Sequence, residues 1–177
     1  MRTDRLQREF GITLRWTVFP LHPDTPDEGT ELSKLLSVSE AEVRTMQARL
    51  IQVAAAEGLP IAERSRTYNS RRAQELGKWA EEMGKGDPYR HAVYRAFFVE
   101  GRNISLVEEL TRIAEEIGLS AAEARSVLTA GSYGAAVDAD WERAEELGIT
   151  AVPTHVCDDK KLVGFTGYDA FVRLIGQ

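Results

Sequence analysis

The hydrophobic pattern of this sequence changes its period twice, and that change limits the possible folds more than any other feature. Residues 12–18 alternate between apolar and polar positions, which predicts a β-strand. A loop rich in proline follows at residues 20–30, and from there to Gly148 the apolar residues recur at helical spacing. After Gly148, the runs PTHVCD and KLVGF predict a β-hairpin with a polar turn between them. Helices are expected before the first strand and in the closing stretch YDAFVRLI.

This order of elements indicates how the chain is divided. A strand near the start and a hairpin near the end can share one sheet only if the two ends of the chain come together. The helical block is then an insertion whose own ends lie close in space. We therefore expect a discontinuous domain of residues 1–22 and 149–177, and a helical insertion domain of residues 23–148.

Several helix starts in the block carry capping signals. A Ser-x-x-Glu pattern predicts a reciprocal capping box, and Asp followed by Pro predicts an N-cap and a first helical residue. The helix after Ser39 is expected to have an apolar face of Val43, Met46, Leu50, Val53 and Ala54. Another helix is expected to begin near Asn69, with an inward face of Ala73, Leu76, Ala80 and Met83. The predicted capping boxes are Ser39–Glu42, Ser105–Glu108 and Ser120–Glu123, and the Asp-Pro start is Asp87–Pro88.

The charge and hydropathy of the chain argue against two classes of partner. The net charge is −6, whereas phosphate binding needs a concentrated basic surface, so nucleic acid is not expected. No apolar run approaches the length of a membrane helix, and the N-terminus has no signal-peptide core, so a cytoplasmic protein is expected. The basic stretch Arg64–Arg72 has two interpretations, a solvated helix start with its loop or a dock for an anionic group.

The sulfur and imidazole content limits the chemistry. Cys157 is the only cysteine, so no intrachain disulfide can form. His155 and Cys157 are two residues apart and would share one face of a strand, but a metal site needs a third ligand. We therefore predict no metal, and expect Cys157 to be a buried, inert thiol.

Four stretches, in this order and spacing, resemble the DsbA-like proteins of the FrnE and 2-hydroxychromene-2-carboxylate isomerase group. They are RWTVFPLHPDTPDEG, YNSRRAQELGKWA, YRAFFVEGRNIS and LGITAVPTHV. The resemblance implies an α/β, thioredoxin-like fold with a large all-helical insertion. It also implies a thiol–disulfide oxidoreductase in which Pro153 is the family's cis-proline.

The resemblance further implies which residues contact the substrate. Val152, before the proline, would offer backbone groups to a bound peptide or to glutathione. The expected substrate-binding residues are Val152, Pro153, Thr154, Asn69 and His22. The expected partners are a thiol- or disulfide-bearing protein or glutathione, with glutathione as a co-substrate, no other cofactor, and a homodimer as one arrangement.

The sequence departs from the family pattern at one point. The family's first strand and its Cys-x-x-Cys motif have no counterpart here, so we assign no catalytic residue and expect a truncated start. In the family fold the missing strand lies between two neighbouring strands, and its loss would leave two unpaired edges. Three explanations are open: the protein begins earlier than this sequence, a second chain supplies a strand, or the two flanking strands pair directly. The alternative functions are a glutathione-dependent isomerase or transferase of this fold, and a non-catalytic binding or dimerisation module.

Overall fold

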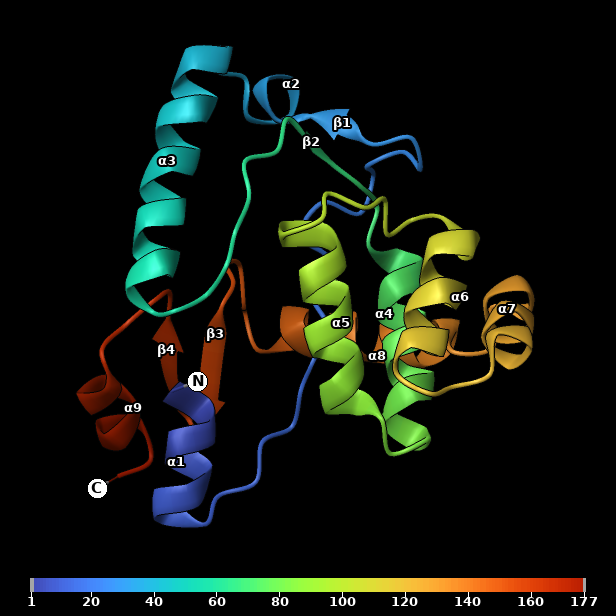
Figure 1. The fold of residues 1–177 in the computed structure, drawn as a ribbon. Helices are drawn as coiled ribbons and strands as arrows, with labels where there is room; N and C mark the ends of the chain where they lie inside the picture. The colour runs from blue at the N-terminus through green and yellow to red at the C-terminus, as the bar shows by residue number, and fades with distance from the viewer. Residues whose placement is uncertain (1, 177) are drawn as a thin grey trace. The chain divides into compact units, whose positions relative to one another are not determined.

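The computed structural model describes residues 2–176, and these residues form nine helices and four short strands (Figure 1). The helices are α1 (Arg2–Phe10), α2 (Leu32–Leu36), α3 (Glu40–Ala56), α4 (Arg71–Glu82), α5 (Gly86–Phe98), α6 (Val107–Glu116), α7 (Ala121–Ala130), α8 (Gly134–Glu146) and α9 (Tyr168–Leu174). The strands are β1 (Thr30–Glu31), β2 (Arg66–Thr67), β3 (Thr154–Cys157) and β4 (Lys160–Val163). Over this range, no helix is both long and apolar enough to cross a membrane.

The chain divides into two compact units, Met1–Leu21 with Asp138–Gln177, and His22–Val137. The second boundary therefore lies inside α8, whereas the hydrophobic pattern places it after Gly148. The hydrogen bonding of Asp140 explains the difference. Its buried carboxylate accepts the backbone N–H of Val18 at 2.9 Å, and Arg15 lies 3.7 Å away. These contacts join the second half of α8 to the N-terminal segment.

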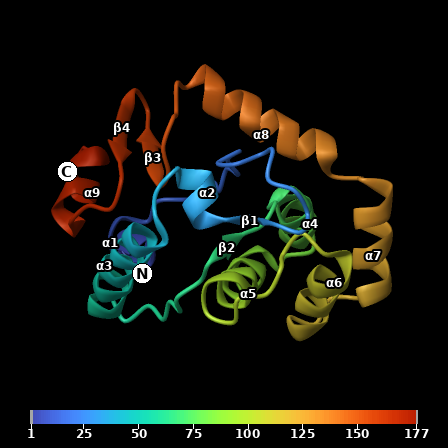
Figure 2. The same ribbon diagram turned by 90° about the horizontal axis from the view of Figure 1, so that it is seen from above.

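The core of the His22–Val137 unit lies among α4, α5, α6 and α7. In Figure 2, α4, α5 and α6 are viewed nearly end-on, so these helices run side by side with nearly parallel axes. Leu76, Leu110 and Ile113 are completely buried between them. The apolar face predicted for α4 is therefore present at Ala73, Leu76 and Ala80, whereas Met83, which follows the last residue of α4, is exposed.

The sequence predicts that this unit is all-helical, but β1 and β2 form a short antiparallel ladder within it. Thr30 pairs with Thr67, and Glu31 pairs with Arg66. Gly29 precedes the ladder with φ +79°, and a Cβ there would lie 2.5 Å from the Thr67 carbonyl oxygen. Two-residue strands carry too little alternation to be seen in a sequence.

Two of the predicted caps are confirmed. Ser39 and Glu42 form a reciprocal capping box at the start of α3. Ser120 caps α7 by accepting the backbone N–H of Glu123. Both serines lie directly before the first residue of their helix, where the side-chain oxygen can reach an unpaired N–H group.

Two other predicted helix starts are wrong. The hydroxyl of Ser105 donates to the carbonyl of Asp27 at 2.6 Å, and α6 begins only at Val107. Ser105 therefore binds the loop that contains Asp27 and does not cap α6. Helix α5 begins at Gly86, before the Asp87–Pro88 pair, because the N–H of Tyr89 already bonds to the carbonyl of Lys85.

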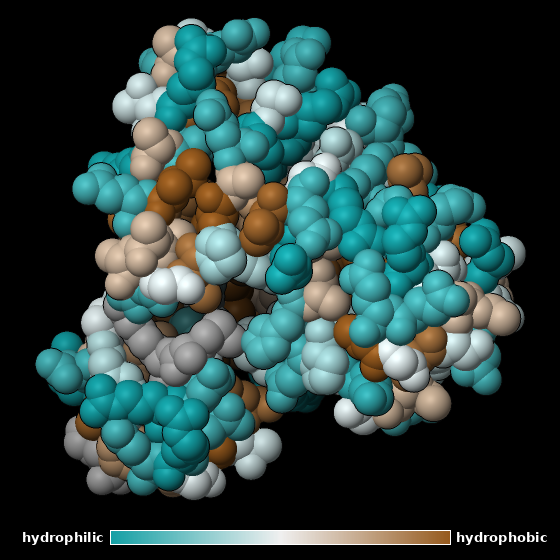
Figure 3. All heavy atoms as spheres, viewed as in Figure 1, coloured by the Kyte–Doolittle hydropathy of each residue, from teal (hydrophilic) through white to brown (hydrophobic). Residues whose placement is uncertain are grey.

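The long helix α3 keeps an apolar face in contact with solvent. Val43 and Ala54 are buried, but Met46, Leu50 and Val53 of the same predicted face are exposed. Hydrophobic side chains accordingly reach the surface beside α3 in Figure 3.

The strand predicted for residues 12–18 is wrong, since this segment carries no strand in the structure. The alternation is retained in the burial only at its start, where Ile12 and Leu14 are less exposed than Thr13 and Arg15, whereas Trp16 of the same predicted face is 41% exposed. A strand also requires a partner that completes its ladder. Among residues 2–176, β3 pairs only with β4, so direct pairing of the segment with β3 does not occur.

Candidate functional site

The loop Ala151–Thr154 leads into β3 and contains three of the predicted binding residues. The Val152–Pro153 peptide bond is cis. The Thr154 hydroxyl donates to the Ala151 carbonyl at 2.6 Å, which closes the loop across the proline. The Pro153 carbonyl accepts the N–H of Gly164 at 2.8 Å, and this bond extends the pairing with β4 beyond the strand.

Val152 differs from its neighbours in this loop. Val152 is 43% exposed, and no group of the described chain forms a hydrogen bond with its backbone N–H or C=O. Exposed backbone donors and acceptors beside a strand are the groups that bind an extended peptide. The loop therefore presents a backbone binding position next to Pro153.

The hairpin has an open edge that continues this position. The β3–β4 register pairs Thr154 with Val163 and Cys157 with Lys160, and Asp158 in the turn has φ 51°. Within the described range, β3 has a partner strand on one side only. An edge strand of this kind is a template for an added strand. The Val152 backbone and the free edge of β3 can therefore be used by one extended ligand.

His155 lies on β3 and packs against α9. Its ring meets Phe171 edge to face, with 4.6 Å between ring centroids. Burial lowers the pKa of His155, because the charged imidazolium loses solvent. Its Nδ1 is buried and has no hydrogen-bond partner in the part of the chain described.

Cys157 follows on the same strand and is half-buried, not fully buried as predicted. The prediction assumed a central strand covered on both sides. In the structure, β3 has a neighbour on one side, which leaves Cys157 less covered.

A polar cluster joins the two terminal helices of this unit. The Tyr168 hydroxyl donates to Glu9 at 2.6 Å, and the Arg5 guanidinium lies 3.9 Å from the centre of the Tyr168 ring. These contacts, led by the hydrogen bond from Tyr168, lower the pKa of Glu9. No local pattern in the sequence links Tyr168 to Glu9, which lies 159 positions away in the chain.

The other two predicted binding residues lie in the His22–Val137 unit. The Asn69 amide donates to the carbonyls of Pro23 and Thr25 at 2.9 and 2.8 Å, and its oxygen accepts the N–H of Arg71 at 2.8 Å. This side chain thus fastens a loop to the start of α4. His22 is exposed and makes a backbone bond to Thr25. The binding residues therefore form two groups, Val152–Thr154 in one unit and Asn69 with His22 in the other.

Acidic and sulfur ligands do not assemble into a metal centre in this structure. Across residues 2–176, no group of three or more His, Cys, Asp or Glu side chains is placed to hold an ion.

Comparison with solved structures defines the class of fold. A structure described as a probable DsbA oxidoreductase from Streptomyces coelicolor superimposes with a TM-score of 0.90 at 26% identity, over 98% of this chain and 80% of that chain. A 2-hydroxychromene-2-carboxylate isomerase superimposes with a TM-score of 0.73 at 20% identity, over 98% of this chain and 83% of that chain. The chain therefore has the thioredoxin-like DsbA fold, with a large helical insertion.

The sequence comparison gives the family. The DSBA-like thioredoxin domain family matches residues 1–176, and the chain belongs to this family. The uncharacterized protein YwbO of Bacillus subtilis (strain 168) is 39% identical over 100 residues. That match covers 56% of this chain and 50% of YwbO, so the chain matches about half the length of this curated relative.

Proposed function

We propose that this chain binds an extended thiol- or disulfide-bearing ligand at Val152–Thr154, as the substrate-binding part of a thiol–disulfide oxidoreductase. The observation that carries the proposal is that Val152 is an exposed residue whose backbone N–H and C=O groups form no hydrogen bond within the described chain. Family membership and the likeness to a probable DsbA oxidoreductase support the reaction class.

In this proposal the loop holds the ligand in place and contributes no sulfur atom to the reaction. An extended ligand would pair its backbone with Val152 and continue along the free edge of β3. The Thr154 hydroxyl, through its bond to Ala151, keeps the loop in the shape that presents Val152. Thiol–disulfide exchange needs an attacking thiolate and a disulfide, and Cys157 is the one sulfur nucleophile in this sequence. The proposal therefore assigns to these residues the binding of the ligand and not the exchange itself.

Two ligands satisfy this chemistry, a cysteine-containing protein segment and glutathione. Glutathione is a short peptide with a thiol at its centre, so the same backbone groups of Val152 can bind it. A glutathione-dependent isomerase of the same fold would use that position as well, and the relative affinities for the two ligands separate the functions.

The test is a binding measurement with an unreactive probe. A fluorescent six-residue peptide with a central S-methylcysteine is titrated with the protein, beside a peptide with alanine at that position. We expect the S-methylcysteine peptide to bind more tightly, and Thr154→Val to weaken its binding. Equal binding of the two peptides, or none, would contradict the proposal. Strong displacement by S-methylglutathione would favour the isomerase.

A further inference from the structure

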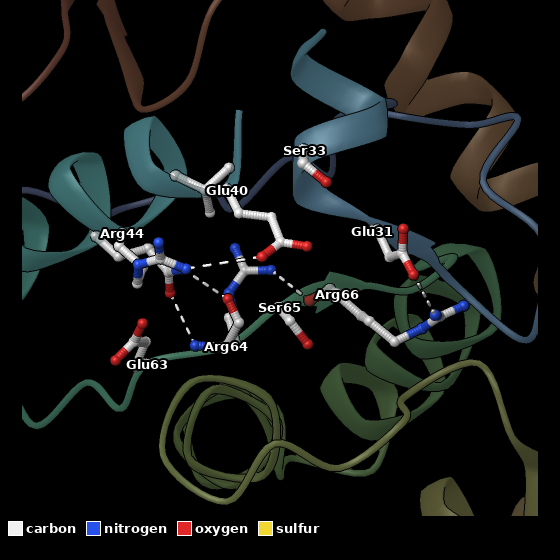
Figure 4. A pocket seen from close by; sticks show the side chains of 10 residues that line it. Glu31, Ser33, Glu40, Arg44, Glu63, Arg64, Ser65 and Arg66 are labelled. Atoms are coloured by element: carbon white, nitrogen blue, oxygen red, sulfur yellow. Dashed lines mark hydrogen bonds and ion pairs between the residues drawn. The ribbon is translucent and has the colours of Figure 1, made fainter. Parts of the chain in front are cut away.

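A second site lies in the His22–Val137 unit, between α2, α3 and the segment that enters β2 (Figure 4). Its cavity has a volume of about 430 Å³, which is within the size range of small-molecule sites. Three arginines line it, namely Arg44 from α3, and Arg64 and Arg66 from the segment below it in Figure 4. This site is separate from the Val152 loop and does not depend on the proposed redox function.

Arg64 is held firmly in place by its surroundings. Its backbone N–H donates to Oε1 of Gln47 at 2.8 Å, and its carbonyl accepts Nε2 of Gln47 at 2.6 Å. The guanidinium carbon lies 4.6 Å from the centre of the Phe97 ring and 5.5 Å from that of Phe98. A guanidinium that is stacked and anchored in this way loses little further freedom when it binds a ligand.

The three arginines of the cavity differ in their acidic partners. Arg44 lies 3.7 Å from Glu40, and Arg66 lies 3.8 Å from Glu31, as the dashed lines of Figure 4 mark. No carboxylate of residues 2–176 lies within ion-pair distance of Arg64. Burial lowers the pKa of the Arg64 guanidinium, because desolvation disfavours its charge.

One edge of this guanidinium is available to a ligand. Its Nη1 donates to the Arg66 carbonyl at 2.9 Å. Its Nε and Nη2 have no hydrogen-bond partner in the described chain, and neither is fully buried. Nε and Nη2 are parallel donors whose spacing matches the two oxygens of a carboxylate.

We propose that this cavity binds a small organic monocarboxylate, with its carboxylate held side-on by Nε and Nη2 of Arg64. Val43 and the aliphatic stem of Gln47, which also line the cavity, would contact the ligand's uncharged body. The three glutamates of the lining, including the exposed Glu63, disfavour ligands with more than one negative charge.

The test compares benzoate with benzamide, which has nearly the same shape and no charge. Each is titrated into the ¹⁵N-labelled protein, and amide chemical shifts are followed. We expect benzoate to shift the amides of Gln47, Arg64 and Ser65, and benzamide to leave them in place. Equal effects of the two compounds, shifts confined to other regions, or no benzoate binding would each overturn the proposal.

Two variants locate the charge that is responsible. Arg64→Gln should raise the benzoate Kd at least about tenfold, equivalent to about 1.4 kcal/mol. Arg44→Gln, which removes a charge of the same cavity already paired with Glu40, should change the Kd less than about twofold. The reverse order of effects would show that Arg64 is not the binding group. The benzoate and benzamide comparison on the unmodified protein decides the proposal if Arg64→Gln does not fold.

Discussion

Replacing Leu76 with alanine tests the core of the helical unit. Leu76 lies on α4, and none of its surface is accessible to solvent. The change removes three buried carbon atoms, which at about 0.8 kcal/mol each amounts to about 2.4 kcal/mol of transfer free energy. The cavity left behind raises the expected loss in the free energy of unfolding to about 3–4 kcal/mol.

Met83→Ala is the matched control for this variant. The hydrophobic period predicts that Met83 faces inward with Leu76, but in the structure Met83 follows the last residue of α4 and is 49% exposed, so its replacement should cost less than about 1 kcal/mol. Both values come from urea unfolding at 25 °C followed by far-UV circular dichroism, with the m-values compared. Equal losses for the two variants, or a loss below about 1 kcal/mol for Leu76→Ala, would refute the reasoning.

Three further substitutions test single contacts. Tyr89→Phe removes a buried hydroxyl that donates to the Ala73 carbonyl at 2.8 Å, so urea unfolding should show a loss of about 1–2 kcal/mol; an unchanged stability would contradict this. Tyr168→Phe should raise the pKa of Glu9 toward its ordinary value, as measured by ¹³C NMR titration, because the Tyr168 hydrogen bond is the main cause that lowers it; an unmoved Glu9 pKa would exclude that cause. Burial lowers the pKa of His155 in the folded state, so the unfolded chain takes up the proton first as the pH falls. The free energy of unfolding should therefore decrease as the pH drops below 6.5, until the pH passes the folded-state pKa. His155→Phe should remove this contribution to the slope, and an identical pH dependence in the variant would show that His155 does not cause it.

Much of the architecture follows from local signals in the sequence. The capping box at Ser39 and the hairpin around Asp158 are set by residues close in the chain, and both were predictable. The strand expected at residues 12–18 failed for a physical reason. Alternation describes which side chains face inward, but a strand also needs a partner backbone, and this depends on distant parts of the chain.

The two sites differ in how far the sequence revealed them. The Pro153 loop could be located because the residues around it resemble a known family, whereas a proline before an apolar run is by itself compatible with an ordinary strand start. The basic stretch Arg64–Arg72 left two interpretations open. Only the structure separates Arg64, which lacks an acidic partner in the described chain, from Arg72, which pairs with Asp27 at 2.6 Å. Ion pairing between residues far apart in sequence leaves no local pattern.

Hydrogen exchange at the Val152 amide tests the central claim most directly. This N–H has no partner in the described chain, so without ligand it should exchange with deuterium at nearly the rate of an unprotected peptide. Saturation with the S-methylcysteine peptide should slow its exchange, whereas the exchange of the Gly164 N–H, already bonded to Pro153, should change little. Unchanged exchange at Val152 under saturating peptide would contradict the proposal that this backbone holds the ligand.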